Sequence, residues 1–141
     1  MIFIDHFNRV NDNHGHLIGL EVPLSRLMGS SFRFHDRLHR FRGEEFVVVM
    51  RCHSEAEALL APERLRTSAE KYAFPQVGQL TVSIGLTEVI AGDSPHAAFE
   101  RAHQAVYFAK GAGRNRVRSH AALVARGKLE GGAGRGDVAL F

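Results

Sequence analysis

Arg42-Gly43-Glu44-Glu45-Phe46 is the most informative part of this chain, because it places two adjacent carboxylates between two apparent strands. Leu38-His39-Arg40-Phe41 precedes it and Val47-Val48-Val49-Met50 follows it, and both flanks are typical of strands. We therefore expect a β-hairpin with these five residues at its tip. Its glycine lets the backbone approach a ligand closely, and adjacent carboxylates at a strand end suit a hard cation such as Mg²⁺. Taken alone, the same pattern also fits an ordinary solvated turn.

The hydrophobic periodicity predicts the elements around this hairpin. Strands are expected over residues 1–4, 80–86 and 116–118, and helices over residues 15–28, 54–72 and 95–112. Pro23 is expected to delay or kink the first helix, and Pro62 is an awkward residue within the second. The order β-α-β-β-α-β-α-β predicts an α/β (α+β) sandwich, with helices packed on a mainly antiparallel sheet.

The composition indicates one ordinary globular domain. The 141 residues are 45% hydrophobic and 23% charged, with a net charge of +3. The 15 arginines outnumber the 3 lysines, which fits either a nucleotide partner or a genome rich in arginine codons. Cys52 is the only cysteine, so an internal disulfide is excluded and a cytoplasmic location is expected. No apolar run approaches the ~20 residues of a membrane span.

The end of the chain differs in character from the rest. Residues 119–141 are rich in glycine and have little periodicity, so we expect a mostly disordered tail. Leu123-Val124 is the one place in it where a short helix could continue. The predicted domain therefore covers residues 1–118.

Several motifs, in order and spacing, resemble the GGDEF family of diguanylate cyclases over residues 1–118. They are Asp5-His6-Phe7, Asn11-Asp12, Gly15-His16, Arg33-Phe34-His35-Asp36, Arg42 to Phe46, Thr81 to Gly85, and Tyr107 to Asn115. Members of that family join two GTP molecules into cyclic di-GMP as homodimers, each subunit holding one GTP. The resemblance implies a cyclase-like, ferredoxin-related fold. Family domains also begin with a helix and an L-T-G-L-x-N-R segment that this sequence lacks, so we expect an N-terminally truncated domain.

The resemblance implies how metal and catalytic groups are arranged. The family is named after a five-residue signature, to which Arg42 to Phe46 correspond here. Glu44 and Glu45 match its third and fourth residues, which are catalytic. Glu44 and the Ile4 backbone carbonyl would be metal ligands. Phe3 stands where the family has a metal-binding aspartate, and a phenyl ring cannot bind Mg²⁺. Because cation affinity depends on the number of charged oxygens, Mg²⁺ binding is expected to be weak or lost. Asp5 could act as a substitute, since it shares a strand face with Phe3 one repeat (~6.5 Å) away.

The resemblance also implies GTP contacts, from Phe7, Asn8, Asn11, Gly43, Lys110 and Arg114. Lys110 and Arg114 match two phosphate-binding cations, and their i, i+4 spacing predicts a shared side where the last helix ends. Read without the family, the same pair fits helix C-terminal capping. Leu20 replaces a guanine-binding aspartate, and Arg42 replaces the first signature glycine. These departures predict impaired catalysis.

A second site is expected at Arg33-Phe34-His35-Asp36, which fits the family's R-x-x-D motif five residues before Arg42. In the family this arginine and aspartate bind cyclic di-GMP, and Arg64 matches a further arginine of that site. Guanidinium and carboxylate groups together can read a guanine edge. Without the resemblance, the three-residue spacing of Arg33 and Asp36 equally fits an ordinary ion pair between residues i and i+3.

Two functions therefore remain open. One is an active diguanylate cyclase working as a homodimer. The other is a degenerate domain that binds cyclic di-GMP as a receptor, or that serves as an interaction module without nucleotide. GTP and cyclic di-GMP are the expected ligands, and neither nucleic acid nor a membrane is an expected partner.

Overall fold

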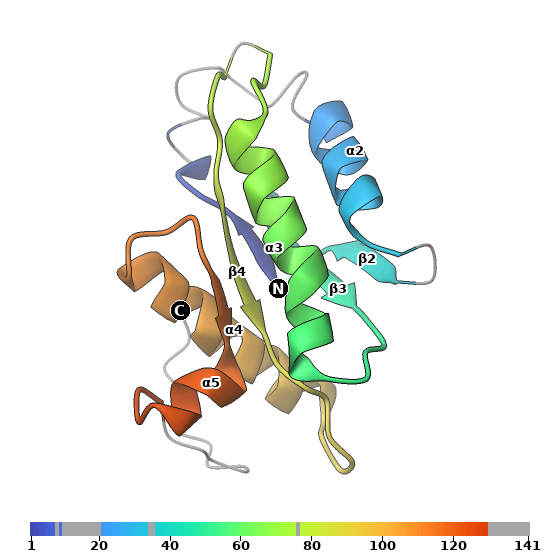
Figure 1. Cartoon of the computed structure of the whole chain (residues 1–141), viewed down its shortest axis with the longest axis vertical. Helices are drawn as coiled ribbons and strands as arrows, with labels where there is room; N and C mark the ends of the chain where they lie inside the picture. The colour runs from blue at the N-terminus through green and yellow to red at the C-terminus, as the bar shows by residue number, and fades with distance from the viewer. Residues whose placement is uncertain (8, 10–20, 34–35, 76, 130–141) are drawn as a thin grey trace.

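The computed structural model describes residues 1–7, 9, 21–33, 36–75 and 77–129. They form a five-stranded sheet with helices on both faces (Figure 1). The strand order is β2-β3-β1-β4-β5, with only β4 and β5 parallel. This confirms the predicted α/β fold with a mainly antiparallel sheet. The elements are β1 (Ile2–Ile4), α2 (Glu21–Ser31), β2 (Arg37–Arg40), β3 (Glu45–Val49), α3 (Glu55–Lys71), β4 (Val82–Leu86), α4 (Pro95–Gly111), β5 (Val117–Ser119) and α5 (His120–Ala125).

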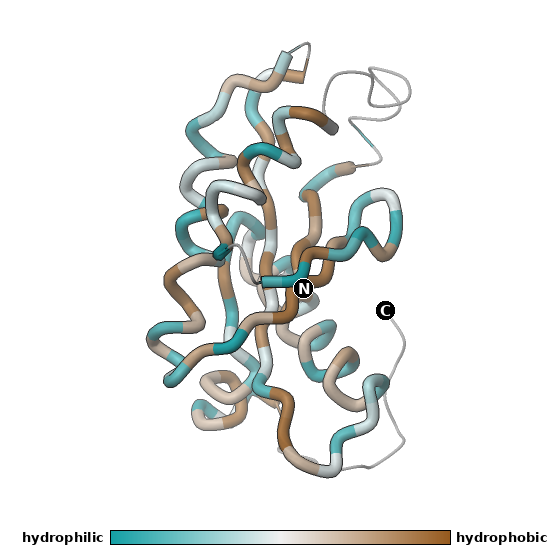
Figure 2. Tube along the Cα trace, turned by 90° about the vertical axis from the view of Figure 1, so that its right-hand side faces the viewer, coloured by the Kyte–Doolittle hydropathy of each residue, from teal (hydrophilic) through white to brown (hydrophobic). Residues whose placement is uncertain are grey.

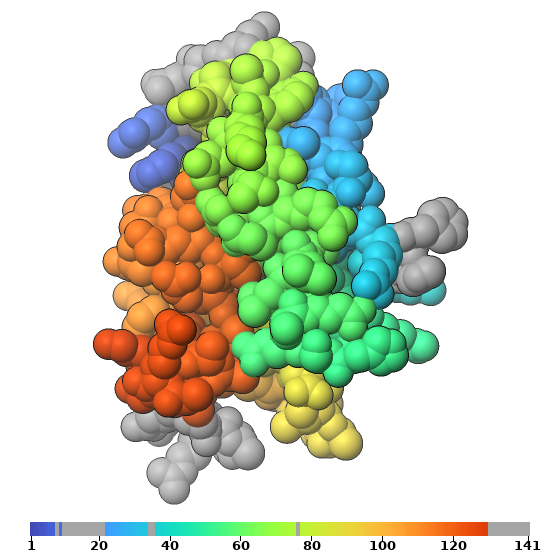
Figure 3. Space-filling view, in the orientation of Figure 1, coloured from blue at the N-terminus to red at the C-terminus, as the bar shows by residue number. Residues whose placement is uncertain are grey.

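One face of the sheet carries the main hydrophobic core. Ile2 and Ile4 of β1 alternate with Phe3, so both isoleucines point to the same side. Seen from the side, the strands lie between the helices and carry much of the hydrophobic sequence (Figure 2). Helices α2 and α3 cover this face, and Figure 3 shows them side by side. The fully enclosed residues of this core include Ile2, Ile4, Met28, Leu65, Val82 and Ile84.

The opposite face of β4 receives α4. Gly85 lies under this helix, and a Cβ there would come within 2.5 Å of the Val106 nitrogen and 2.9 Å of the Ala105 Cβ. Only a residue without a side chain allows such a close approach of strand and helix. The small residues Ala105 and Ala109 are fully buried on the same helix. As a result α4 brings Lys110 to Phe3 of β1 and His103 to Glu45 of β3.

Helices α3 and α4 begin and end within one residue of the predicted bounds. The Ser54 hydroxyl accepts a hydrogen bond from the Glu57 amide at 3.1 Å, as expected of an N-cap. Pro62 neither ends nor shortens α3, which runs on through it to Lys71. The expected start of the first helix, from residue 15 to 20, lies outside the described residues. Pro23 falls in the first turn of α2, where a missing N–H is tolerated.

The short helix considered possible near Leu123 is present as α5. Leu123 and His120 are both buried, and Ser119 caps the helix through its hydroxyl. The predicted tail therefore begins with a packed helix, and its last residues, 130–141, lie outside the described residues. In the part of the chain that is described, no helix combines the length and the apolar character needed to cross a membrane.

Candidate functional site

The predicted hairpin forms, and its tip covers residues 41–44 instead of 42–46. Arg40 pairs with Phe46, and the Phe41 amide donates to the Glu45 carbonyl at 2.9 Å. Glu45 is therefore already part of β3. Positive φ among described non-glycine residues is confined to His6, Arg114 and Asn115. Arg42 consequently occupies the first signature position without backbone strain.

The end of β1 meets this hairpin tip. Phe3 lies opposite Glu45 in the ladder between β1 and β3, and the Ile4 amide donates to the Glu44 carbonyl at 3.0 Å. A Cβ on Gly43 would lie 3.4 Å from the Phe7 ring, so that ring rests beside the tip. The fold thus brings together most positions that the resemblance assigned to metal, catalysis and GTP. Asn8, Asn11 and Leu20 lie outside the described residues.

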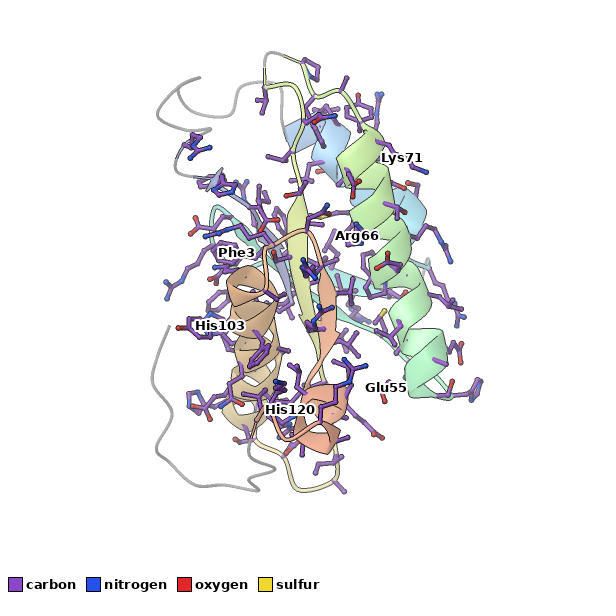
Figure 4. The ribbon with its side chains drawn as sticks, turned by 60° about the vertical axis from the view of Figure 1, so that its left-hand side comes forward. Phe3, Glu55, Arg66, Lys71, His103 and His120 are labelled. Carbon is purple, nitrogen blue, oxygen red and sulfur yellow. The ribbon has the colours of Figure 1, made fainter. Side chains whose placement is uncertain are left out.

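Lys110 reaches the same place from α4. Its Nζ atom lies 3.0 Å from the centroid of the Phe3 ring, which is a cation–π contact. Figure 4 shows Phe3 near the end of α4, with His103 further along that helix. Partial burial lowers the pKa of Lys110, and the nearby Glu45, Asp5 and Glu44 carboxylates act in the opposite direction. The ammonium group therefore lies among the acids at this edge of the sheet.

Asp5, considered as a substitute for the missing aspartate, is buried and hydrogen-bonded. Its carboxylate, only 3% exposed, accepts hydrogen bonds from the Ser83 hydroxyl at 2.6 Å and the Thr81 hydroxyl at 2.7 Å. It also accepts from the Asn115 backbone amide at 3.0 Å. These donors engage both oxygens, which favours a structural role for Asp5 over the replacement of the missing aspartate. Asp5 instead ties the end of β1 to β4 and to the turn after α4.

We expect Asp5→Asn to lower the free energy of unfolding by about 1–3 kcal/mol, because an amide nitrogen must then face a hydrogen-bond donor. Urea denaturation measures the change. Asp36→Asn is the matched control, since an asparagine can still accept a turn N–H and should cost less than ~0.5 kcal/mol. Equal effects of the two substitutions would show that the buried bonds of Asp5 do not stabilise the fold.

The prediction that Lys110 and Arg114 lie on the same side of the last helix is wrong. Helix α4 ends at Gly111, and Arg114 lies beyond it in a left-handed turn with φ of 62°. The Arg114 amide donates to the Ala109 carbonyl at 3.0 Å, so its backbone caps the helix. The Arg114 side chain is exposed and lines an open hollow of about 430 Å³ between α3 and the start of β5. Arg66, Arg116 and Arg118 line the same hollow.

The second predicted site gathers where α2 ends beside α3. The Asp36 carboxylate accepts the Arg33 backbone amide at 2.9 Å, and the Asp36 amide donates to the Arg33 carbonyl at 3.0 Å. Arg64 donates to the Ser31 carbonyl at 3.3 Å, two residues before Arg33. The fold therefore brings Arg33, Asp36 and Arg64 to one place.

The guanidinium of Arg33 pairs with Glu57 of α3, at 2.7 Å. Within the described part of this loop, the simple i, i+3 ion pair between the Arg33 and Asp36 side chains is not formed. A hydrogen bond from the His53 amide and one from Arg33 lower the pKa of Glu57. Glu57 was not predicted as a member of this site. Its spacing of seven residues from Arg64, two helical turns, was the signal that both lie on one side of α3.

His103 was also missed. Its Nε2 atom lies 3.9 Å from a Glu45 oxygen, and its ring stacks beside Phe99 with centroids 6.2 Å apart. Burial lowers the pKa of His103, against the effect of Glu45. The seven-residue spacing between His103 and Lys110 places both on the same side of α4, which is a detectable sequence signal.

Comparison with known proteins agrees with this geometry. The sequence matches the family described as diguanylate cyclase, GGDEF domain, over residues 1–116. The chain belongs to the GGDEF family. It is 38% identical over 130 residues to the response regulator PleD of Caulobacter vibrioides, covering 86% of this chain and 29% of PleD. The chain therefore spans less than a third of that relative's length.

Two solved GGDEF structures are similar to this domain. The GGDEF domain of DgcB from Caulobacter crescentus, in complex with c-di-GMP, has a TM-score of 0.77 and 30% identity, covering 85% of this chain and 75% of that one. The active GGEEF domain of a diguanylate cyclase from Vibrio cholerae has a TM-score of 0.74 and 32% identity, covering 84% and 79%. The second comparison shows that glutamates like Glu44 and Glu45 occur in an active relative.

The GGDEF family typically uses Mg²⁺, but the residues at the corresponding place here do not fit it. Phe3 has an aromatic ring where the family has a carboxylate, and the Lys110 ammonium contacts that ring. The Glu45 carboxylate lies near His103 and is largely buried. Among the residues that the structure describes, no cluster of three or more His, Cys, Asp or Glu side chains could hold a metal ion.

Proposed function

We propose that this GGDEF domain is an impaired diguanylate cyclase that binds cyclic di-GMP through Arg33, Asp36 and Arg64. The observation that carries the receptor function is the convergence of these three side chains beside α3. The DgcB domain in complex with c-di-GMP supports it by similarity. In this site the guanidinium groups donate to the guanine acceptors, and Asp36 accepts from the guanine N–H groups.

Catalytic impairment is supported by the end of β1. Joining two nucleotides requires a 3′-hydroxyl to attack an α-phosphate while a cation neutralises the developing charge. At this place Phe3 stands where the family has a metal-binding aspartate, and the Lys110 ammonium lies on its ring. Glu44 is the remaining carboxylate that matches a metal ligand of the family. A second change adds to this effect, because the Arg42 side chain stands at the turn where the family has glycine. Loss of the metal ligand thus weakens turnover while leaving the second site intact.

Glu57 sets the affinity of the proposed cyclic di-GMP site. Its carboxylate already bonds to Arg33, so a bound guanine competes with Glu57 for that guanidinium. The pair is exposed on the arginine side, with 56% of the Arg33 side chain accessible, so breaking it costs little. Asp36 is held by backbone bonds and is already oriented. The site is therefore largely formed before ligand arrives.

Calorimetry with cyclic di-GMP in the presence of EDTA tests this function. Arg33→Ala should weaken binding about tenfold or more, since a bidentate guanine contact contributes ~1–3 kcal/mol. Asp36→Asn should weaken it too, because an amide accepts fewer N–H donors. Glu57→Gln should tighten binding by roughly threefold, because it removes the competing charge.

Arg37→Ala is the matched control, since Arg37 is an exposed arginine of β2 near the same loop. Its removal should leave the affinity within about twofold, the range of a surface charge. Absence of cyclic di-GMP binding to the folded wild type would contradict the receptor function and favour a nucleotide-free interaction module. Equal affinity in wild type and Arg33→Ala would place the ligand elsewhere.

An active homodimeric cyclase is the second candidate. It is favoured by the retained Gly43, Glu44 and Lys110 at one edge of the sheet, and by similarity to the active GGEEF domain of Vibrio cholerae. In that case each subunit would hold one GTP, and the two sites would face each other.

A further inference from the structure

We propose that Lys110, seated on the Phe3 ring, replaces the divalent cation at this edge of the sheet, so that the site binds the phosphate chain of a nucleoside triphosphate without metal. This goes beyond the proposed cyclic di-GMP receptor, because it concerns a different site and a different ligand. It follows from the disagreement between the residues present and the Mg²⁺ that the family uses.

The aromatic ring is what keeps the ammonium available. An aspartate at position 3 would form an ion pair with Lys110 and neutralise it, whereas the Phe3 ring holds it by a cation–π contact at 3.0 Å. Among the described residues, no carboxylate makes an ion pair with Lys110. The ammonium therefore keeps N–H donors that phosphate oxygens can accept.

The two unusual residues also restore the charge of the missing ion. Phe3 in place of aspartate removes one negative charge, and Arg42 in place of glycine adds one positive charge. Together they raise the local charge by two, which is the charge of one Mg²⁺. Arg42 lies in the turn itself, and Lys110 lies on the ring of Phe3, which is opposite Glu45 in the ladder, so both cations lie near the hairpin tip.

Arg42 is placed at the rim of the site. Its guanidinium lies 5.5 Å from the Phe41 ring centroid, and the residue is exposed at the turn. Gly43, next to it, has the Phe7 ring close beside its backbone, 3.4 Å from where a Cβ would stand. A triphosphate lying over this turn would have Lys110 at its inner end and Arg42 at its outer end.

The test is calorimetry of GTP and of inorganic triphosphate, each in EDTA and in MgCl₂, with protein saturated with cyclic di-GMP. Affinities with and without magnesium should agree within about threefold, because a resident cation already supplies the charge. Lys110→Gln should weaken binding about tenfold or more, the effect of losing a charge-assisted contact. Lys71→Gln, which removes an exposed lysine from the end of α3, is the matched control and should change little.

In the Phe3→Asp variant, binding of GTP and triphosphate should become dependent on magnesium, because Lys110 then pairs with the new carboxylate. Wild-type binding that disappears in EDTA and returns with MgCl₂ would overturn the proposal without any variant. Equal binding by wild type and a folded Lys110→Gln protein would also overturn it. Neither result bears on cyclic di-GMP binding at Arg33, which is measured separately.

Discussion

Purified protein supplied with GTP and Mg²⁺ should form cyclic di-GMP at least about 100-fold more slowly than the active GGEEF domain of Vibrio cholerae assayed beside it. A bound metal ion lowers the activation barrier by several kcal/mol, and each ~1.4 kcal/mol of barrier changes the rate tenfold. Loss of the metal ion therefore accounts for the expected decrease in rate. Phe3 cannot supply the missing ligand, and Asp5 is held by Ser83, Thr81 and Asn115. Chromatography of the nucleotide products gives the rate directly.

The double substitution Phe3→Asp with Arg42→Gly tests whether these two positions cause the loss of activity. It should raise the rate of cyclic di-GMP formation in the presence of Mg²⁺ if the defect lies at these two positions. No gain from the pair would place the defect elsewhere in the chain. Robust product formation by the wild type that is abolished by Glu44→Ala would contradict the impaired function and favour the active cyclase.

Gly85→Ala should lower the free energy of unfolding by about 3 kcal/mol or more, the upper end of the cost of overpacking. The new Cβ would lie within 2.5 Å of the Val106 nitrogen, and a helix backbone cannot move as a flexible side chain can. Helix α4 would have to shift away from β4, carrying Lys110 with it. Urea denaturation gives the loss of stability.

Gly29→Ala is the matched control for this effect. Gly29 lies in α2 with nothing within 4 Å of an added Cβ, so alanine there should raise stability by ~0.5–1 kcal/mol through helix propensity. If Gly85→Ala were as stable as Gly29→Ala, the close packing of α4 against β4 would be contradicted.

The elements could be predicted because their signals are local. Alternation around the hairpin, the cap at Ser54 and the Pro95 start of α4 each depend on residues within a few positions of one another. Family membership was also predictable, since the motifs keep their order and spacing along the chain. Prediction failed for the placement of Arg114 relative to Lys110, because a helical i, i+4 spacing does not apply to Arg114, which lies beyond the end of α4 at Gly111.

The fold class, the family and the departures at Phe3 and Arg42 could all be predicted from the amino-acid sequence. The surroundings of those two residues depend on contacts between distant parts of the chain. Asp5 bonds to Asn115 across 110 positions, and Lys110 meets the Phe3 ring because β1 lies beside β4 in the sheet. Periodicity reports which face a residue takes, but it carries no information about which distant residue shares that face. That choice is made when the strands pair and α4 packs across them.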